Sequence, residues 1–362
     1  MSRGGIDALL LVSFGGPEGP DDVMPFLENV TRGRGVPRER LEEVSHHYLA
    51  LGGVSPINAQ NRALLAALRE ELDRRGVDLP VEWGNRNWEP FLAPAIERLH
   101  AAGHRRILAL TTSVYSSYSS CRQYREDLAR ALADAGLGDE VVVERVRQAF
   151  DHPGFIAPFA EGLTGALAML RDEGVEAAET RLLFTTHSIP TAMAEASGPR
   201  GVFGGDGAYV AQHEAAIAAV LAGVDGRAAL PAWSLAYQSR SGSPHVPWLE
   251  PDINDVIRSA AADGARAVVV VPIGFVSDHV EVVWDLDHEA RATADELGLR
   301  FLRVATPGTH PAWVSGLVDL IEERTSAGPA AALSPLGPWP AVCAPACCAN
   351  PRAPLPAVAG SD

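Results

Sequence analysis

Residues 267–273 read AVVVVPI, an unbroken apolar run without alternation of polar and apolar side chains. A strand of this kind is buried on both faces, as in a parallel sheet covered by helices. Four more runs predict strands, at Ala8–Phe14, Ile107–Thr112, Leu182–Thr186 and Ser234–Tyr237. Longer helical patterns separate them, and this alternation indicates βα units. The sequence therefore predicts an α/β fold with parallel sheets.

Two internal similarities predict that the chain is a duplicated, doubly wound unit. SFGGP at Ser13 and THSIP at Thr186 each close an apolar strand, so that Phe14 and His187 hold matching positions. The glycines at 103 and 264 also precede apolar strands at similar offsets. We expect two similar α/β lobes.

The expected domains are an N-terminal lobe, Met1–Gln148, a C-terminal lobe, Ala149–Thr325, and a tail, residues 326–362. The tail is rich in Ala, Pro and Gly. Such a composition predicts a segment without a core of its own.

A net charge of -16 over 362 residues disfavours nucleic acid and anionic membrane surfaces as partners. The N-terminal residues resemble a first strand rather than a signal peptide. The apolar stretch Ala267–Val276 is far below the ~20 residues of a membrane helix. We expect a soluble, cytoplasmic protein without stable membrane insertion.

The segment SDHVEVVWDLDHE, residues 277–289, places four acids at helical spacing: Asp278, Glu281, Asp285 and Glu289. Valine, tryptophan and leucine side chains between them require burial. Because a buried row of like charges needs protons or a cation, it is a candidate metal site or proton path. The alternative is a solvated acidic face on an ordinary helix.

Ligands of open α/β sheets bind beyond the carboxyl ends of the strands. This rule places Phe14, His187 and residues 274–281 around one cleft. An imidazole facing a carboxylate suits Fe(II) or a similar metal, and both groups accept protons. A structural histidine and a metal-dependent hydrolase are the alternatives, although no His-x-x-x-His motif near this pair supports a tight zinc site.

The four cysteines, Cys121, Cys343, Cys347 and Cys348, are too few and too uneven for a disulfide framework. Four thiolates are enough for a [2Fe-2S] cluster, which would order the tail. A structural zinc and free thiols are the alternatives.

Several motifs of the chain, in this order, resemble the ferrochelatases, and within them the branch that metallates coproporphyrin III. The resemblance runs from Leu9 to about Glu323. It rests on SFGGPEGP at Ser13, TRGRG at Thr31, GGVSPIN at Gly52, the segment Tyr115 to Tyr124, TTHSIP at Thr185, YQSRSGSPHVPWLEP at Tyr237 and GFVSDHVEVVWDLDHE at Gly274. The fold it implies is a pair of chelatase-like lobes.

The resemblance implies that His187 and Glu281 form the inner metal-binding and catalytic pair. Fe(II) is then a substrate, inserted into a porphyrin with release of two pyrrole protons. Asp285 and Glu289 would relay those protons or feed the metal. We expect a π-type irregularity in this helix, as is frequent at functional sites.

The resemblance also assigns coproporphyrin III as substrate. Ser55 and Tyr124 are expected to bind its propionates, and Arg32 or Arg34 to supply positive charge. Without the resemblance these would be an ordinary turn serine and a basic loop. Phe14 departs from the tyrosine of some relatives, and this removes an axial oxygen ligand for the product iron.

The resemblance further supports a [2Fe-2S] cluster on the four cysteines, as in actinobacterial-type ferrochelatases. Three functional alternatives stay open: a chelatase acting on protoporphyrin IX, one inserting another divalent metal, and a non-catalytic tetrapyrrole or iron-sulfur sensor. The sequence indicates neither the iron donor nor the protein that accepts the product.

Overall fold

The computed structural model describes residues 5–33, 35–205, 207–225, 230–242, 245–326 and 328–361. These residues contain two four-stranded sheets in which every strand pair is parallel. The first sheet has the order β2-β1-β3-β4 and the second the order β6-β5-β7-β8. The strands are β1 Ala8–Ser13, β2 Val81–Asn85, β3 Arg106–Thr111, β4 Val142–Arg145, β5 Thr180–His187, β6 Ala232–Gln238, β7 Ala267–Val271 and β8 Arg300–Arg303.

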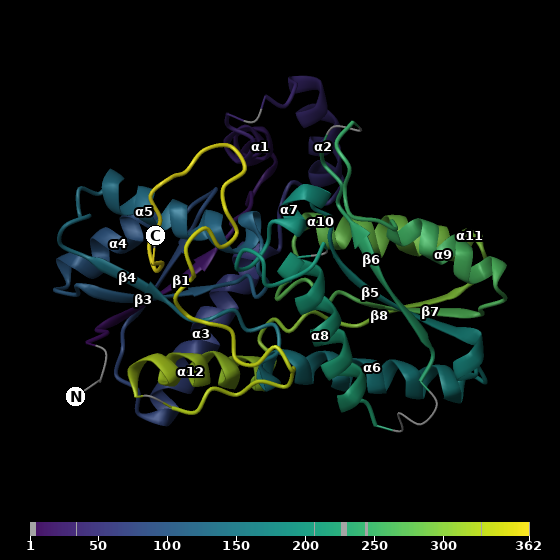
Figure 1. Ribbon diagram of the computed structural model, residues 1–362. Helices are drawn as coiled ribbons and strands as arrows, with labels where there is room; N and C mark the ends of the chain where they lie inside the picture. Colours follow the sequence, from purple (N-terminus) through teal and green to yellow (C-terminus); the bar gives the residue numbers. More distant parts are fainter. Residues whose placement is uncertain are drawn as a thin grey trace.

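The two sheets repeat one topology, because each places its second strand beside its first and then adds the third and fourth. β1 and β5 are therefore counterparts. Phe14 directly follows β1 and His187 is the last residue of β5, so the two residues hold equivalent places. The predicted α/β class with similar parallel sheets is confirmed (Figure 1).

All five strands expected from apolar runs are present, with ends shifted by at most two residues. The sequence patterns missed β2, β4 and β8, which are all edge strands. An edge strand is covered less completely than a central one and tolerates charge. β4 and β8 accordingly read VVER and RFLR, without a continuous apolar signal.

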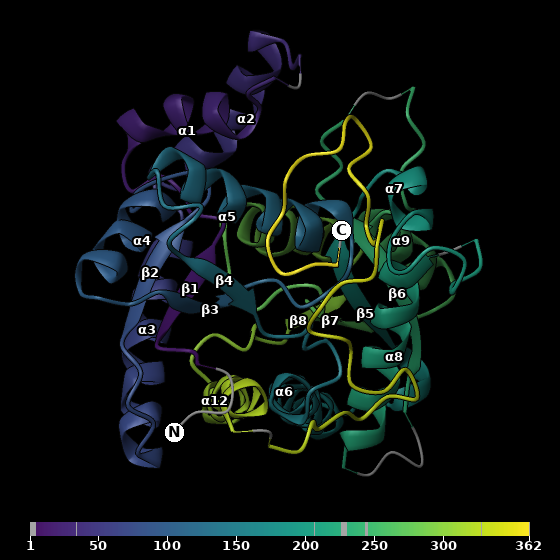
Figure 2. The same ribbon diagram turned by 60° about the vertical axis from the view of Figure 1, so that its left-hand side comes forward.

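Helices cover both faces of each sheet (Figures 1 and 2). The α-helices are α1 Val23–Val30, α2 Arg38–Ala50, α3 Ile57–Arg75, α4 Leu92–Ala101, α5 Gln123–Asp134, α6 Pro153–Asp172, α7 Thr191–Glu195, α8 Gly207–Gly223, α9 Ile253–Ala262, α10 Val280–Val282, α11 Arg291–Glu296 and α12 Pro311–Thr325. Segments Pro20–Asp22 and Ala177–Glu179 are 3-10 helices, and Tyr118–Arg122 and Val283–Ala290 are π-helices.

One large hydrophobic core joins the two sheets. It contains Leu9 and Leu11 of β1, Phe184 of β5, Val269 of β7 and Trp313 of α12. Separate clusters cover the opposite face of each sheet. Because one core serves both sheets, the two rows of strand ends are held in a fixed relation.

Helix α6 is long and apolar enough to cross a membrane by length and composition. Its Phe155, Phe159 and Leu163 are fully buried in the shared core, and α6 lies beside α12 (Figure 2). Within this fold α6 is a core helix.

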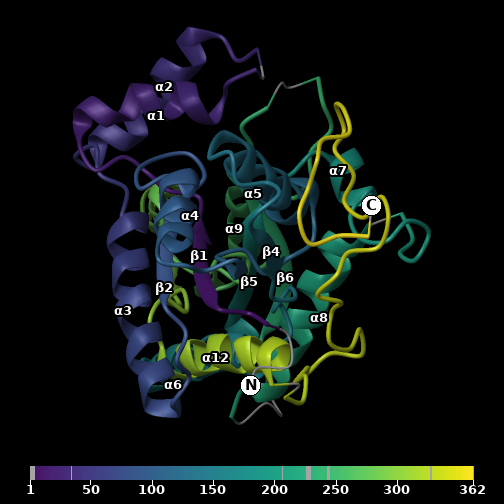
Figure 3. The same cartoon turned by 90° about the vertical axis from the view of Figure 1, so that its left-hand side faces the viewer.

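The tail crosses the molecule beside α5 and α7 without forming a helix or strand in its described residues, 328–361 (Figures 2 and 3). Backbone contacts hold it. Arg125 Nε donates to Val358 O over 2.6 Å, and Leu333 N donates to Asp151 O over 2.9 Å. Trp339 is buried in the shared core. The tail is thus anchored to the body of the protein.

Candidate active site

His187 and Glu281 are brought together at the carboxyl end of the second sheet. His187 ends β5, and its Nδ1 donates a hydrogen bond to Ser188 O. Since a carbonyl only accepts, the neutral ring keeps its lone pair on Nε2. Nε2 lies 3.7 Å from Glu281 Oε2, and both side chains are about one-third exposed, at 33% and 39%. A base and a carboxylate therefore face each other at the surface of the cleft.

Glu281 lies on the short helix α10, which continues directly into the π-helix Val283–Ala290. Val280, Val282, Leu286 and Ala290 of this continuous segment are buried. Val282, Leu286 and Ala290 pack in the hydrophobic cluster of the second sheet, whereas Val280 packs with Phe26 of α1 and Tyr48 of α2. The expected π-type irregularity is confirmed.

The expectation that Asp278 continues the acidic row is wrong. Helix α10 begins at Val280, and Asp278 lies before it. Its carboxylate accepts hydrogen bonds from Arg303 over 3.1 and 3.2 Å and from Thr306 over 3.2 Å. Because Arg303 neutralises its charge, Asp278 supports the chain next to the helix instead of extending the row.

Asp285 lies one helical turn beyond Glu281 and is held by two hydrogen bonds. It accepts hydrogen bonds from the Ser239 hydroxyl and from Gln238 Nε2, the latter over 3.3 Å. Ser239 has a left-handed backbone, φ 62°, a strained conformation for a serine. Burial raises the pKa of Asp285 to about 7, with Glu281 and Glu289 adding to the rise against the Ser239 hydrogen bond. Asp285 can therefore exchange a proton near neutral pH.

Glu289 continues the row at the exposed end. It accepts a hydrogen bond of 2.8 Å from Trp284 Nε1. The Trp284 ring stacks on His47 of α2, with centroids 4.5 Å apart, and on His288, at 5.2 Å. The row Glu281, Asp285 and Glu289 thus runs from the cleft to solvent.

Sequence patterns missed His279, although it lies inside the motif. Its Nδ1 is 3.9 Å from Glu281 Oε2, on the same oxygen that faces His187. Burial lowers the pKa of His279, so its ring is neutral at physiological pH. Only its position directly before the helix pointed to the site. Glu281 is consequently flanked by two imidazoles.

A cavity of about 600 Å³ opens beside this pair. Ser188, Tyr237, Gln238 and Arg240 line it, together with residues 249–252 and Asp255. Ser188, which follows His187, and Gln238, which donates to Asp285, line this cavity, so it lies next to neighbours of the acid and base system.

Phe14 and Tyr124 both contact the guanidinium of Arg86, which directly follows β2 of the first sheet. Arg86 is 5.7 Å from the Phe14 ring and 4.2 Å from the Tyr124 ring. It is buried and pairs with Asp127 over 2.5 Å. Sequence patterns missed Arg86 because both contacts are cation-π contacts between distant segments.

Ser55 lies beside the end of β1. Gly16 follows this strand, and a Cβ at Gly16 would lie 2.6 Å from Ser55 Cβ. Ser55 and Tyr124 are both buried. Arg32 follows α1 and is exposed, unlike the buried Ser55 and Tyr124. Arg34 lies outside the described residues. Of the expected propionate-binding residues, Ser55 and Tyr124 therefore lie near the first sheet's end, and Arg32 lies apart on the surface.

All four cysteines gather in one buried cluster, here called the sulfur group: Cys121, Cys343, Cys347 and Cys348. None forms a disulfide. Cys347 Sγ and Cys348 Sγ are 3.9 Å apart. Arg145 donates to Cys343 Sγ over 3.0 Å, and the Gly198 amide donates to Cys348 Sγ over 3.2 Å. A π-helix and the tail, more than 200 residues apart, thus meet at sulfur.

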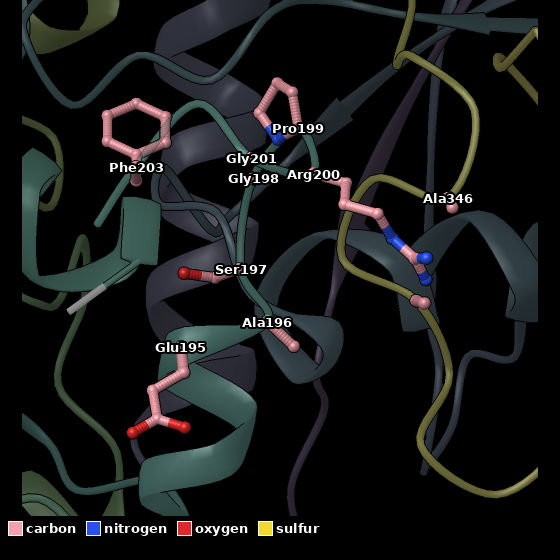
Figure 4. Close-up of a pocket in the computed structure, with 10 residues that line it drawn as sticks. Glu195, Ala196, Ser197, Gly198, Pro199, Arg200, Gly201, Phe203 and Ala346 are labelled. Carbon is pink, nitrogen blue, oxygen red and sulfur yellow. The ribbon is translucent and has the colours of Figure 1, made fainter. Parts of the chain in front are cut away.

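A small cavity of about 120 Å³ adjoins the sulfur group. Gly198 and its neighbours in residues 195–203 line one side, and Ala346 and Ala349 of the tail line the other. Figure 4 shows the Arg200 side chain extending toward Ala346. The cavity belongs to the surroundings of the cysteines and lies apart from the His187 and Glu281 pair.

Among the residues that the structure describes, no group of three or more His, Cys, Asp or Glu side chains has the arrangement of a preformed metal site. The sulfur group and the His187 and Glu281 pair are therefore close sets of donors that need side-chain adjustment to bind metal.

Comparison with known proteins shows the family of this chain. Residues 6–325 match the profile of the Ferrochelatase family. The coproporphyrin III ferrochelatase of Leifsonia xyli is 55% identical, over 98% of this chain and 94% of the relative. The coproporphyrin III ferrochelatase of Streptomyces griseus is 54% identical, over 98% of this chain and 96% of the relative. That of Tropheryma whipplei is 52% identical, over 96% of this chain and 89% of the relative. The chain belongs to the ferrochelatase family.

Proposed function

We propose that this protein inserts ferrous iron into coproporphyrin III and yields the iron coproporphyrin used in haem b synthesis. The observation that carries the proposal is the His187 and Glu281 pair at the end of β5, with 3.7 Å between Nε2 and Oε2, in a ferrochelatase chain. The substrate follows from relatives that are named coproporphyrin III ferrochelatases at 52–55% identity.

The reaction exchanges Fe(II) for two pyrrole protons and involves no change of oxidation state. The Nε2 lone pair of His187 and the carboxylate of Glu281 are the two acceptors at hand. In this proposal they receive the protons as the pyrrole nitrogens bind iron. A ring bent out of plane within the cleft exposes its nitrogen lone pairs, which favours the transition state over the flat substrate.

The protons then leave along the acidic row. Asp285, with its pKa of about 7, accepts a proton from Glu281 and releases it again near neutral pH. Glu289, at the exposed end, passes it to solvent. The same carboxylates can attract Fe(II) before insertion, because oxygen ligands and imidazole suit this metal.

Porphyrin binding is assigned to the end of the first sheet. Ser55 and Tyr124 bind propionates in this proposal, and Arg32 or Arg34 adds positive charge. Phe14 offers an apolar face where a tyrosine would offer oxygen to iron. Arg86 contacts both the Phe14 ring and the Tyr124 ring and so links them.

For the sulfur group we propose a [2Fe-2S] cluster. Its chemistry fits, because Cys121, Cys343, Cys347 and Cys348 are buried and unbridged, and two N–H donors point at sulfur. Ligand sulfurs on one tetrahedral metal lie about 3.8 Å apart when metal–sulfur bonds are ~2.3 Å, close to the 3.9 Å between Cys347 and Cys348. The left-handed backbone of Cys348, φ 54°, allows adjacent residues to converge. When bound, a cluster supplies a one-electron couple and a covalent link between the tail and Cys121.

A cytoplasmic location is part of the same proposal. The substrate iron is ferrous and the sulfur group carries free thiols, and both persist in a reducing compartment.

The test is anaerobic incubation of the purified protein with Fe(II) and either coproporphyrin III or protoporphyrin IX, followed by porphyrin absorption. Rapid metallation of coproporphyrin III alone supports the proposal. Faster metallation of protoporphyrin IX would show that the proposed substrate is wrong and that protoporphyrin IX is the substrate. Binding of both without metallation would favour a sensor and overturn the enzymatic proposal. In the same assay Glu281→Gln should lose metallation. Its control is Asp295→Asn, which removes an exposed carboxylate on α11.

A further inference from the structure

Two tyrosine hydroxyls hold the backbone at the ends of the two strands that lead to the catalytic pair. Tyr209 of α8 donates to His187 O over 2.9 Å. Tyr115, which follows β3 of the first sheet, donates to Ile273 O over 3.0 Å. Ile273 follows β7, and the chain continues from it to Glu281. Each hydroxyl therefore fixes the approach to one member of the pair.

The two tyrosines are held by the histidine that packs against both. The His213 ring stacks on Tyr115, with centroids 3.6 Å apart and planes 12° apart. It also contacts Tyr209, with centroids 4.5 Å apart. Tyr115, Tyr209 and His213, here called the aromatic stack, are all buried. A change in one ring is thus transmitted to the other by contact.

His213 is a neutral spacer within this stack. Its Nδ1 donates to Tyr209 O over 2.7 Å, and burial lowers its pKa to about 3. Its Nε2 is buried without a hydrogen-bond partner. Leaving a buried polar atom unpaired costs free energy, so His213 lowers the stability of the fold at this atom.

The contacts around Tyr209 also join the two strands to each other. The Thr186 hydroxyl lies 2.9 Å from the Tyr209 hydroxyl. A Cβ at Gly274 would lie 2.2 Å from Thr186 Oγ1, so the segment after β7 packs directly on this group. The Gly274 amide donates to Thr185 O over 3.0 Å. Movement of the Tyr209 hydroxyl would consequently shift both His187 and the segment that leads to Glu281.

We propose that Tyr209 is a positioning residue for metallation: through the aromatic stack and its bond to His187 O, it sets the separation between His187 Nε2 and Glu281 Oε2. Tyr209 itself does not touch the substrate in this proposal. The inference rests on the proposed function for its kinetic test, whereas its geometry is independent of the substrate.

The kinetic test is Tyr209→Phe, which removes the hydroxyl and keeps the ring in contact with His213. We expect kcat for coproporphyrin III metallation to fall about tenfold or more, because small displacements of reacting groups are costly. The KM for the porphyrin should stay within about twofold of the parent value, because the first sheet binds it. The matched control is Tyr118→Phe, whose hydroxyl donates to Glu126 instead.

A second measurement separates positioning from folding and from the proposed function. Co(II) binding without porphyrin is followed by calorimetry well below the melting temperature of each variant, and the heat that is lost in Glu281→Gln is the part that belongs to the pair. Tyr209→Phe should weaken Co(II) binding, and its crystal structure should show a changed His187 to Glu281 separation. An unchanged kcat in Tyr209→Phe would overturn the proposal. If the parent protein metallates neither porphyrin, an unchanged Co(II) affinity together with an unchanged His187 to Glu281 separation would overturn it instead.

Discussion

The carboxylate of Asp285, on the helix that follows β7, accepts a hydrogen bond from the hydroxyl of Ser239, which follows β6. The two strands lie on either side of β5, whose last residue is His187. The bond therefore spans the strand that carries the proposed base and fixes the acidic row relative to it.

The pKa of Asp285, about 7, predicts the pH dependence of metallation. Below pH 7 Asp285 is protonated and cannot take a proton from Glu281, so kcat should rise with pH through a midpoint near 7. Asp285→Asn should remove this limb and lower kcat about 10- to 100-fold. The measurement is kcat between pH 5.5 and 9, with Asp295→Asn as control. A limb that persists in Asp285→Asn would assign the titration to another group.

The same shift predicts how stability changes with pH. An acid with a pKa raised in the folded state binds its proton more tightly when folded. It favours folding at acidic pH, and this contribution is lost as pH rises from the unfolded pKa, near 3.9, through about 7. We therefore compare the free energy of unfolding of Asp285→Asn with that of the parent protein at each pH. This difference should favour the variant more at pH 8 than at pH 5. Urea unfolding at both pH values measures this difference; an equal change at both would contradict it.

His187→Ala and Glu281→Gln should each reduce metallation by at least about 100-fold, since each removes a proton acceptor beside the ring. Porphyrin binding, measured by fluorescence quenching, should be largely retained. His104→Ala, at a residue that precedes β3 of the first sheet and lies beside Asp7, controls for loss of an imidazole. Substantial turnover in both site variants would refute the assignment of the pair.

Cys121→Ser should abolish the iron-sulfur absorption of anaerobically purified protein and lower its iron and sulfide content. It should also release the tail, because the link at Cys343 and Cys348 is lost, and make residues 328–361 sensitive to protease. Ser334→Ala, which removes a 2.7 Å hydrogen bond between the tail and Asp151, is the control for loosening without cluster loss. If the purified protein contains zinc but no sulfide, the sulfur group holds a structural zinc and the proposal of a cluster is wrong.

Sequence patterns were informative where burial is continuous along the chain. The central strands, such as β7 with its four valines, were recognised because both their faces are covered. Three of the four edge strands, β2, β4 and β8, were missed because charge is tolerated there, whereas the edge strand β6 was recognised. Spacing also identified Glu281, Asp285 and Glu289, whereas it included Asp278 because it could not show where the helix begins.

The remaining site residues depend on contacts between distant segments. Arg86 contacts Tyr124 from another element, and Tyr209 reaches the carbonyl of His187 across 22 residues. Neither contact leaves a periodic signal in one sequence. His279 was overlooked for a different reason: its neutral ring is set by burial, which spacing does not reveal.

The position of the sulfur group has a consequence for biosynthesis of the protein itself. Cys121 emerges from the ribosome early, whereas Cys343, Cys347 and Cys348 are added after both sheets are complete. The four thiols can gather only after residue 348 has been added. A chain truncated before the tail would keep the eight described strands and the His187 and Glu281 pair but lack three of the four thiols, so the sulfur group reports that the tail has been synthesised.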